Sequence, residues 1–234
     1  MRIILKSLLY TIYYMQVGIK NYYPVVLYLI ISQFLVMITQ NIFLVLFFFI
    51  GYVIFSSPLG INIFRNIILD TELNTSYTNI FRKDYTKIFL NRIFYLLFSI
   101  LVIYIIHIIL LSPFFPKDIS KITYYLYLLF AYMIYIYSRI MFILPSAACG
   151  LKKNLKDSYL FTRGKSIKIF VFYLMLIAPY VLINFLISNY TSILEYKVIF
   201  IIISIFMQIF FTIISTSLVG YLYKDIENKI NSLN

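Results

Sequence analysis

Six long stretches of apolar residues constrain this chain more than any other feature of its sequence. They cover residues 22–38, 42–57, 89–111, 122–146, 167–188 and 196–221. All eight acidic residues fall outside these stretches or at their edges. Because a helix that spans a bilayer needs about 20 mostly apolar residues, the pattern predicts an all-α, polytopic membrane protein. We expect one integral membrane domain, residues 1–234, with six transmembrane helices.

The first two stretches are separated only by Thr39, Gln40 and Asn41. A continuous helix over residues 22–57 would be about 54 Å long at ~1.5 Å per residue, far longer than a single crossing requires. The sequence therefore favours a tight hairpin of two spans. One bent span followed by an interfacial piece would also use up this length.

The composition excludes most other classes of protein. Hydrophobic residues make up 63% of the chain and charged residues 12%, about half the charged share of a typical soluble domain. The 24 Tyr and 23 Phe argue against disorder. One Cys excludes an internal disulfide, and one His leaves little for a metal site. Since no catalytic or nucleotide-binding motif occurs either, we expect neither an enzyme nor a cofactor.

The basic residues predict the orientation in the membrane. With six spans, the side that holds both termini carries 17 of the 20 Lys and Arg residues, and the other side carries Lys117, Lys121 and Lys197. Positive residues are retained on the cytoplasmic side of a bilayer. Both termini are therefore expected in the cytoplasm, and the protein is expected in a cell inner (plasma) membrane.

Residues 1–21 precede the first span and have an amphipathic pattern. At about 100° per residue, Arg2, Lys6 and Lys20 share one face, while Ile4 and Leu8 lie mostly opposite. This pattern predicts a helix on the surface of the inner leaflet. The alternative is a partial hydrophobic segment that is buried in the bundle.

Two long cytoplasmic connections are expected to contain helices of their own. In the first, residues 61–72 predict a short helix, and a second helix from Tyr77 leads into the third span. In the second, Leu151, Leu155 and Tyr159 form an apolar stripe that predicts a segment along the inner leaflet. Gly164 is expected to stop this helix with a positive φ.

A dense basic cluster lies in and after the second connection. Its members are Lys152, Lys153, Lys156, Arg163, Lys165 and Lys168. Each charge near an anionic leaflet is worth about 1 kcal/mol, so these residues are candidate contacts for anionic lipid headgroups or for an acidic partner. Ordinary positive-inside topology is the simpler explanation of the cluster. It also explains the net charge, so we expect no binding of nucleic acid.

Three pieces of the chain carry a resemblance to a known family. Arg139 precedes Pro145 and Ala147 in an R-x5-P-[SA]-x-A pattern, and Thr-Arg-Gly at 162–164 opens a later span. Together with residues 64–72, this order resembles a family of small, uncharacterised multi-pass bacterial inner-membrane proteins. Phe64 stands where the family often has a histidine. The resemblance implies about six helices and this compartment, and no particular activity.

The sixth stretch carries a polar residue at every fourth position. Ser204, Gln208, Thr212 and Thr216 form this polar stripe. A buried amide in hydrocarbon must find partners, and Gln33 and Asn184 are the candidates for Gln208. The stripe predicts either hydrogen bonds between packed helices or one wall of a polar conduit.

Arg139 lies near the cytoplasmic end of the fourth stretch. Tyr125, Tyr132, Tyr135 and Arg139 share one helical face, which we expect to turn into the bundle. Two roles are open for Arg139. It could bind an anion or a lipid headgroup, or it could reach the inner interface and bond a carbonyl freed by Pro145. An acidic loop residue such as Asp70 or Glu72 is a further candidate partner for Arg139.

His107 and Cys149 are the remaining single residues of chemical interest. His107 lies near the outer end of the third stretch, where an interfacial, hydrogen-bonded side chain is more common than a ligand. Cys149 follows the fourth stretch without a neighbouring His or second Cys, so a catalytic role is not expected.

Together these features favour a non-enzymatic membrane protein with a structural role or a role accessory to transport or envelope processes. The alternative is a small permease or transporter subunit with a polar path lined by the fourth and sixth helices. A lipid-modifying enzyme ranks third, because paired acid and base residues are missing. A continuous polar cavity between Arg139 and Gln208 would favour transport.

Overall fold

Helices make up almost all of the computed structural model, which describes residues 2–39, 42–71, 77–111, 119–151, 153–190 and 197–231. The helices are α1 (Arg2–Val17), α2 (Ile19–Thr39), α3 (Ile42–Leu69), α4 (Tyr77–Phe81), α5 (Asp84–Leu111), α6 (Ile119–Ile140), α7 (Ile143–Ala148), α8 (Leu155–Phe161), α9 (Ser166–Tyr190) and α10 (Lys197–Asn231). The described residues contain no strand. The all-α prediction is thereby confirmed.

Four stretches of the described helices are long and apolar enough to cross a membrane. They are Phe43–Leu69, Asp84–Leu110, Ala131–Ala148 and Ile201–Asn228. Two shorter apolar stretches, Tyr22–Leu35 in α2 and Ser166–Pro179 in α9, accompany them. The structure therefore supports a membrane protein with at least these four candidate spans.

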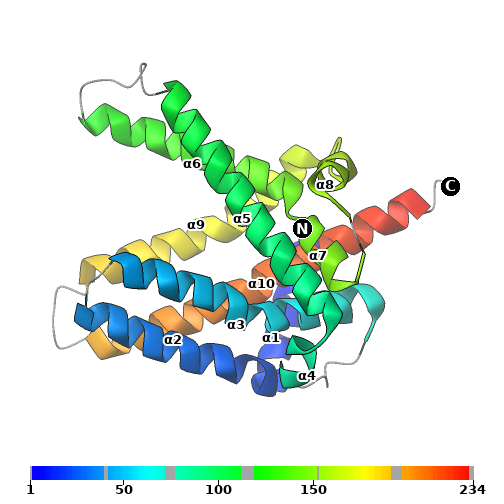
Figure 1. The fold of residues 1–234 in the computed structure, drawn as a ribbon, viewed down its shortest axis with the longest axis horizontal. Helices are drawn as coiled ribbons and strands as arrows, with labels where there is room; N and C mark the ends of the chain where they lie inside the picture. The colour runs from blue at the N-terminus through cyan, green and yellow to red at the C-terminus, as the bar shows by residue number, and fades with distance from the viewer. Residues whose placement is uncertain are drawn as a thin grey trace.

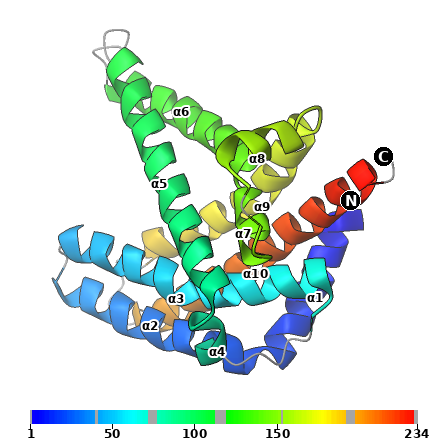
Figure 2. The ribbon, with the colours of Figure 1, turned by 45° about the vertical axis from the view of Figure 1, so that its right-hand side comes forward.

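The long helices form two arms that extend from a common base. In Figure 1, α2, α3, α9 and α10 run roughly alongside one another, while α5 and α6 lead away as a second arm. Figure 2 shows the two arms diverging, with α7 near the place where they meet. Since α2 and α3 are separate helices that lie side by side, the predicted division of residues 22–57 into two neighbouring helices is confirmed.

The helix α3 continues through Pro58 to Leu69, so the separate short helix predicted over residues 61–72 is wrong. Proline has no N–H to offer the carbonyl four residues earlier, which here belongs to Ile54. The hydroxyl of Ser57 donates to that carbonyl at 2.7 Å. The side chain thus replaces the missing backbone bond, and the helix is not interrupted.

Two other predicted helices are broken in the structure. The stretch 122–146 is divided into α6 and α7 by a turn at Met141 and Phe142, just before Pro145. Without an N–H on Pro145, the Met141 carbonyl instead accepts from the Leu144 N–H at 3.0 Å. The helix predicted from Tyr77 is likewise divided into α4 and α5 by a turn at residues 82–83.

The helix α1 packs along α10, with its hydroxyl-bearing face inward. Ser7, Tyr10, Thr11 and Tyr14 are buried, and the Ser217 hydroxyl donates to the Ser7 carbonyl at 3.3 Å. The opposite face exposes leucine and isoleucine side chains together with Arg2 and Lys6. One face of α1 therefore packs in the bundle. The outward face is suited to a lipid environment rather than to water.

Most of the fully buried side chains gather at the base of the two arms. This region, which we call the junction, consists of residues 57–67 of α3, 141–148 around α7 and 213–226 of α10. Ile61, Met141, Phe142 and Tyr223 are at most 1% exposed there. The junction positions the polar and basic residues described next.

Candidate functional site

A small cavity lies where the arms enter the junction. Its volume is about 120 Å³, and α3, α5, α6, α7, α9 and α10 all contribute to its wall. Seven of its lining residues bear hydroxyls: Ser56, Ser57, Tyr137, Tyr173, Thr212, Ser215 and Thr216. Since a liquid water occupies about 30 Å³, the cavity has room for roughly four waters. The polar stripe thus leads to this cavity through Thr212 and Thr216.

Most of the serine and threonine hydroxyls at this cavity already donate their hydrogens to backbone carbonyls. Ser57 donates to Ile54, Ser215 donates to the Thr212 carbonyl at 3.1 Å, and Thr212 donates to the Gln208 carbonyl at 2.7 Å. A hydroxyl that donates once still has acceptor lone pairs. The wall therefore offers acceptor oxygens among aromatic rings, which suits water or another neutral hydrogen-bond donor.

Gln208 does not line this cavity and has a partner elsewhere. The amide nitrogen of Gln33 in α2 donates to the Gln208 side-chain oxygen at 3.4 Å. This confirms Gln33 as a partner. Asn184, the other predicted partner, lies outside the described side chains. Arg139 does not line the cavity either, so this cavity does not provide the continuous polar path between Arg139 and Gln208 that would favour transport.

Three basic side chains of the junction and its surroundings cap the ends of neighbouring helices. Lys224 donates to the Ile67 carbonyl in the last turn of α3, at 2.9 Å, and pairs with Asp70 at 2.9 Å. Arg65 donates to the Ala148 carbonyl at the end of α7, at 3.2 Å. The last carbonyls of a helix lack intrahelical partners and carry partial negative charge. Basic side chains therefore satisfy them and bind the helices together.

Arg139 is the third of these capping residues. Its side chain is 8% exposed, and its Nη2 donates to the Tyr159 carbonyl at 3.0 Å, near the end of α8. The guanidinium also lies 3.5 Å from the Tyr159 ring centroid, and Nε donates to Thr162 Oγ1 at 3.3 Å. Arg139 thus bonds a carbonyl, as one interpretation expected. That carbonyl lies in α8 and not beside Pro145, and Asp70 instead pairs with Lys224.

The tyrosine face of α6 turns inward only in part. Tyr135 packs edge to face on Phe170 of α9, with ring centroids 5.8 Å apart. Tyr125 and Tyr132 are 44% and 43% exposed, so the prediction that they pack into the bundle is wrong. Figure 2 shows α5 and α6 leading away from the base as a pair, and Tyr132 lies against the His107 ring of α5.

The basic cluster of the second connection is divided by the fold. Lys153 turns inward, where its Nζ donates to the Tyr223 hydroxyl at 2.7 Å and lies 3.9 Å from Glu227. Lys156, Arg163 and Lys168 are exposed, and Lys165 is partly buried. Lys152 lies outside the described residues. The candidates for headgroup contact that face outward are therefore those after Lys153.

The loop that holds this cluster follows the predicted turn chemistry. Gly164 has a φ of 76°, which confirms the positive φ expected between the second connection and the next span. Asn154 accepts from the Asp157 N–H at 2.9 Å, and Asp157 accepts from the Asn154 N–H at the same distance. This reciprocal pair caps the start of α8.

The two single residues of chemical interest are both held in structural contacts. Burial raises the pKa of the Cys149 thiol from 9.0 to about 11, although Arg65 and Lys153 act in the opposite direction. His107 hydrogen-bonds the Ile103 carbonyl at 2.7 Å and lies against the Tyr132 ring. The Cys149 thiol is therefore protonated at neutral pH, which makes it a poor nucleophile.

Several of these contacts cannot be predicted from the sequence. Arg65 was only a charge on one side of the membrane and a member of the resembling segment 64–72. Lys224 was only such a charge, and Tyr137, Tyr173 and Tyr223 were only apolar residues. The position of a basic residue relative to another helix's last turn depends on tertiary packing. Among the described residues, no three His, Cys, Asp or Glu side chains gather where they could hold a metal ion.

Comparisons with protein-family models, with curated proteins and with solved structures gave no match.

Proposed function

We propose that this chain is a non-enzymatic integral protein of a bacterial inner membrane, with a structural role or a role accessory to transport or envelope processes. It crosses the bilayer six times, with α2 and α9 as the two shorter spans, and keeps both termini in the cytoplasm. The 17 to 3 distribution of basic residues supports this orientation. The arrangement of the helices also supports it, because both arms extend away from the base that holds the termini (Figure 2).

The main support for a non-enzymatic role is that the buried and partly buried basic residues make structural contacts within the protein. Arg65, Arg139 and Lys224 each donate to a carbonyl in the last turn of a neighbouring helix, and Lys153 binds Tyr223. Each of these side chains thus joins two segments of the protein. Such an arrangement supports a rigid cytoplasmic base rather than a reaction centre.

Reporter fusions test the topology and separate six spans from four. With six spans, a reporter after residue 150 and one after Asn234 act on the same, cytoplasmic side. With only the four candidate spans α3, α5, α6–α7 and α10, these two reporters act on opposite sides. Periplasmic reporter activity at either position would therefore reject the six-span proposal.

Purification tests the accessory role. The tagged full-length protein is extracted in mild detergent, and co-eluting proteins and lipids are identified, with the Arg139→Ala variant as a comparison. We expect a defined set of membrane or envelope proteins in amounts comparable to the bait. Turnover of a lipid or peptide substrate by the purified protein would contradict the non-enzymatic role.

The hydroxyl-lined cavity favours a second candidate, a small permease for a neutral polar solute. Its wall includes Tyr137 of α6 and Thr212 and Thr216 of α10, which are the two helices expected to line a path. Stopped-flow measurements on proteoliposomes would show solute flux above that of protein-free vesicles. Thr216→Met should fill the cavity and stop this flux. Ser204→Met on the same helix, outside the cavity, should not, and absence of flux in the unmodified protein rejects this candidate.

A further inference from the structure

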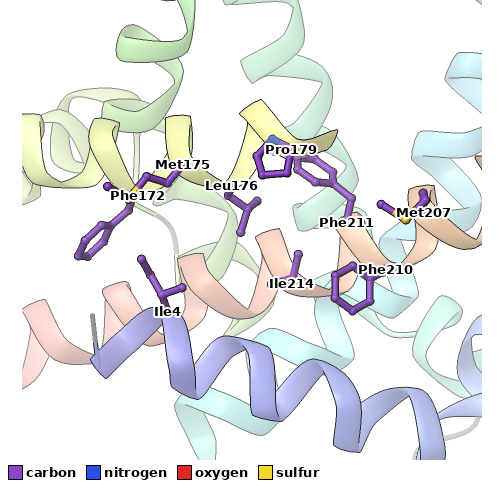
Figure 3. Close-up of a pocket in the computed structure, with 9 residues that line it drawn as sticks. All are labelled: Ile4, Phe172, Met175, Leu176, Pro179, Met207, Phe210, Phe211 and Ile214. Carbon is purple, nitrogen blue, oxygen red and sulfur yellow. The ribbon is translucent and has the colours of Figure 1, made fainter. Parts of the chain in front are cut away.

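A second hollow lies on the side of the bundle where α9, α10 and α1 meet. Its volume is about 200 Å³, and Phe172, Met175 and Leu176 of α9 form part of its wall. Figure 3 shows Phe172 and Ile4 at one end, Leu176 and Ile214 in the middle, and Met207 at the other end. All nine residues that line it are apolar. We call this hollow the lipid groove, for the reason given below.

A basic side chain lies at the end of the groove that is nearest the junction. Lys168 lies one helical turn before Phe172 in α9, and its Nζ is 5.7 Å from the centroid of the Phe172 ring. Its side chain is exposed. The apolar walls thus lead to one exposed cation, Lys168.

We propose that this groove binds an anionic phospholipid of the inner leaflet, with one acyl chain along α9 and α10 and the headgroup at Lys168. The proposal rests on the membrane insertion proposed above. At about 30 Å³ for each group of water size, the groove takes up roughly seven methylene-sized groups. It therefore holds part of one chain, while the rest of the lipid remains in the bilayer.

The headgroup must provide the preference for this site. An acyl chain gains little when it leaves the bilayer for the groove, because lipid tails are as apolar as the groove side chains. A basic residue near a negative headgroup contributes more, about fivefold in affinity for each charge. The juxtaposition of the groove with Lys168 therefore predicts selection by headgroup charge.

The sequence provides a clean probe, because the chain contains no tryptophan. Phe210→Trp places a single tryptophan in the groove, which can be excited selectively beside the tyrosines. The protein is reconstituted in bilayers that contain phosphatidylglycerol or phosphatidylcholine with brominated acyl chains, which quench tryptophan on contact. We expect several times stronger quenching by the phosphatidylglycerol. Phe98→Trp, a residue of α5 that is 64% exposed, reports the general lipid surface and should be quenched equally by both.

Two further variants locate the headgroup contact. In the Phe210→Trp background, Lys168→Gln should reduce the preference for phosphatidylglycerol about fivefold. Lys156→Gln, an exposed lysine in α8 away from the groove, should leave the preference unchanged. If Phe210→Trp perturbs the fold by circular dichroism, Phe172→Trp takes its place at the other end of the groove.

The outcomes separate this proposal from the membrane proposal. Equal quenching of the groove tryptophan by both lipids would overturn headgroup selection. Protection of the groove tryptophan from both lipids, with Phe98→Trp still quenched, would mean that protein occupies the groove and would also overturn it. Absence of quenching at both positions would instead reject membrane insertion.

Discussion

In soluble proteins the most apolar helices are the most buried. The helix α5 and the segment Ala131–Ala148 show the opposite relation. Of the four candidate spans, the one in α5 is the most apolar, yet only 6% of its 18-residue stretch is buried. Ala131–Ala148 is the least apolar, and 61% of it is buried. In water such an arrangement would expose a large apolar surface. In a bilayer it places the most apolar helix against lipid.

The two regions are therefore held together by different forces. Along the arms, side chains such as Phe98 and Ile109 face outward, and burial against lipid gives no reason for the helices to associate. In the junction, close packing and capping by basic side chains join segments that are far apart in sequence. We expect the stability of the fold to depend on the junction far more than on the arms.

The largest expected effect on the free energy of unfolding comes from removing one aromatic ring from the junction. The same change in an arm serves as the comparison. Phe142 is 1% exposed, and its ring packs against those of Phe161 and Tyr223. Phe142→Ala should reduce the free energy of unfolding by about 3–5 kcal/mol, because the loss of a buried ring leaves a cavity. Phe98→Ala in α5 should change it by less than about 0.5 kcal/mol. Thermal unfolding in detergent measures both.

If both alanine variants are destabilised to a similar degree, α5 has a protein partner in the membrane. The distinction between junction and arms would then apply to the isolated chain only.

The arms follow from the sequence more directly than the junction does. The bounds of α2 and α9 lie within a few residues of the predicted spans 22–38 and 167–188, because a run of apolar residues is sufficient to specify a helix in lipid. The division of 22–57 into two helices is also evident from the length of the run. No other information is needed for these elements.

The junction depends on tertiary contacts that periodicity does not contain. The continuation of α3 past Pro58 requires the Ser57 hydroxyl, and the break before Pro145 occurs where α7 packs between α3 and α5. Both prolines belong to apolar runs, and local sequence alone does not distinguish their effects. The pairing of Gln208 with Gln33 was predictable because a polar group in hydrocarbon has few partners.

The second prediction concerns the Cys149 thiol, which follows α7 at the edge of the junction. The raised pKa of about 11 reduces the thiolate share of Cys149 at neutral pH by about a hundredfold relative to an ordinary thiol at 9.0. Alkylation by iodoacetamide should be slow at pH 7.5 and should rise about tenfold for each pH unit up to about 11. Leu151→Cys in a Cys149→Ser background provides an exposed control, since Leu151 is 44% exposed.

The same shift contributes to stability in a defined pH window. The fold favours the protonated thiol, so this contribution is fully present below pH 9 and is lost as the pH rises through about 11. Equal alkylation rates at Cys149 and at the Leu151→Cys control would show that this part of the junction opens to solvent.

The third prediction tests a capping residue. Arg139→Ala should reduce the free energy of unfolding by about 2 kcal/mol, because it removes charge-assisted hydrogen bonds to Tyr159 and Thr162. Arg139→Lys should retain part of this, since an ammonium keeps the charge but loses the planar contact with the Tyr159 ring. Arg163→Ala, an exposed control of the same charge, should have almost no effect. A loss of the same size at Arg163 would show that net charge, and not capping, is responsible.

The smallest effect on the free energy of unfolding is expected from a polar contact between two helices of the same arm, α2 and α10. Gln33 in α2 and Gln208 in α10 share one side-chain hydrogen bond, at 3.4 Å. Hydrogen bonds between membrane helices contribute about 0.6 kcal/mol on average, because each polar group also finds partners when the helices separate within the membrane. In a double-mutant cycle with Gln33→Ala and Gln208→Ala, the coupling free energy from thermal unfolding should have about this size. The exposed Gln16 of α1 provides the control, and Gln16→Ala combined with Gln208→Ala should show no coupling. A coupling of 2 kcal/mol or more would place a specific, strong contact in the arm and would remove the energetic distinction between the arm and the junction.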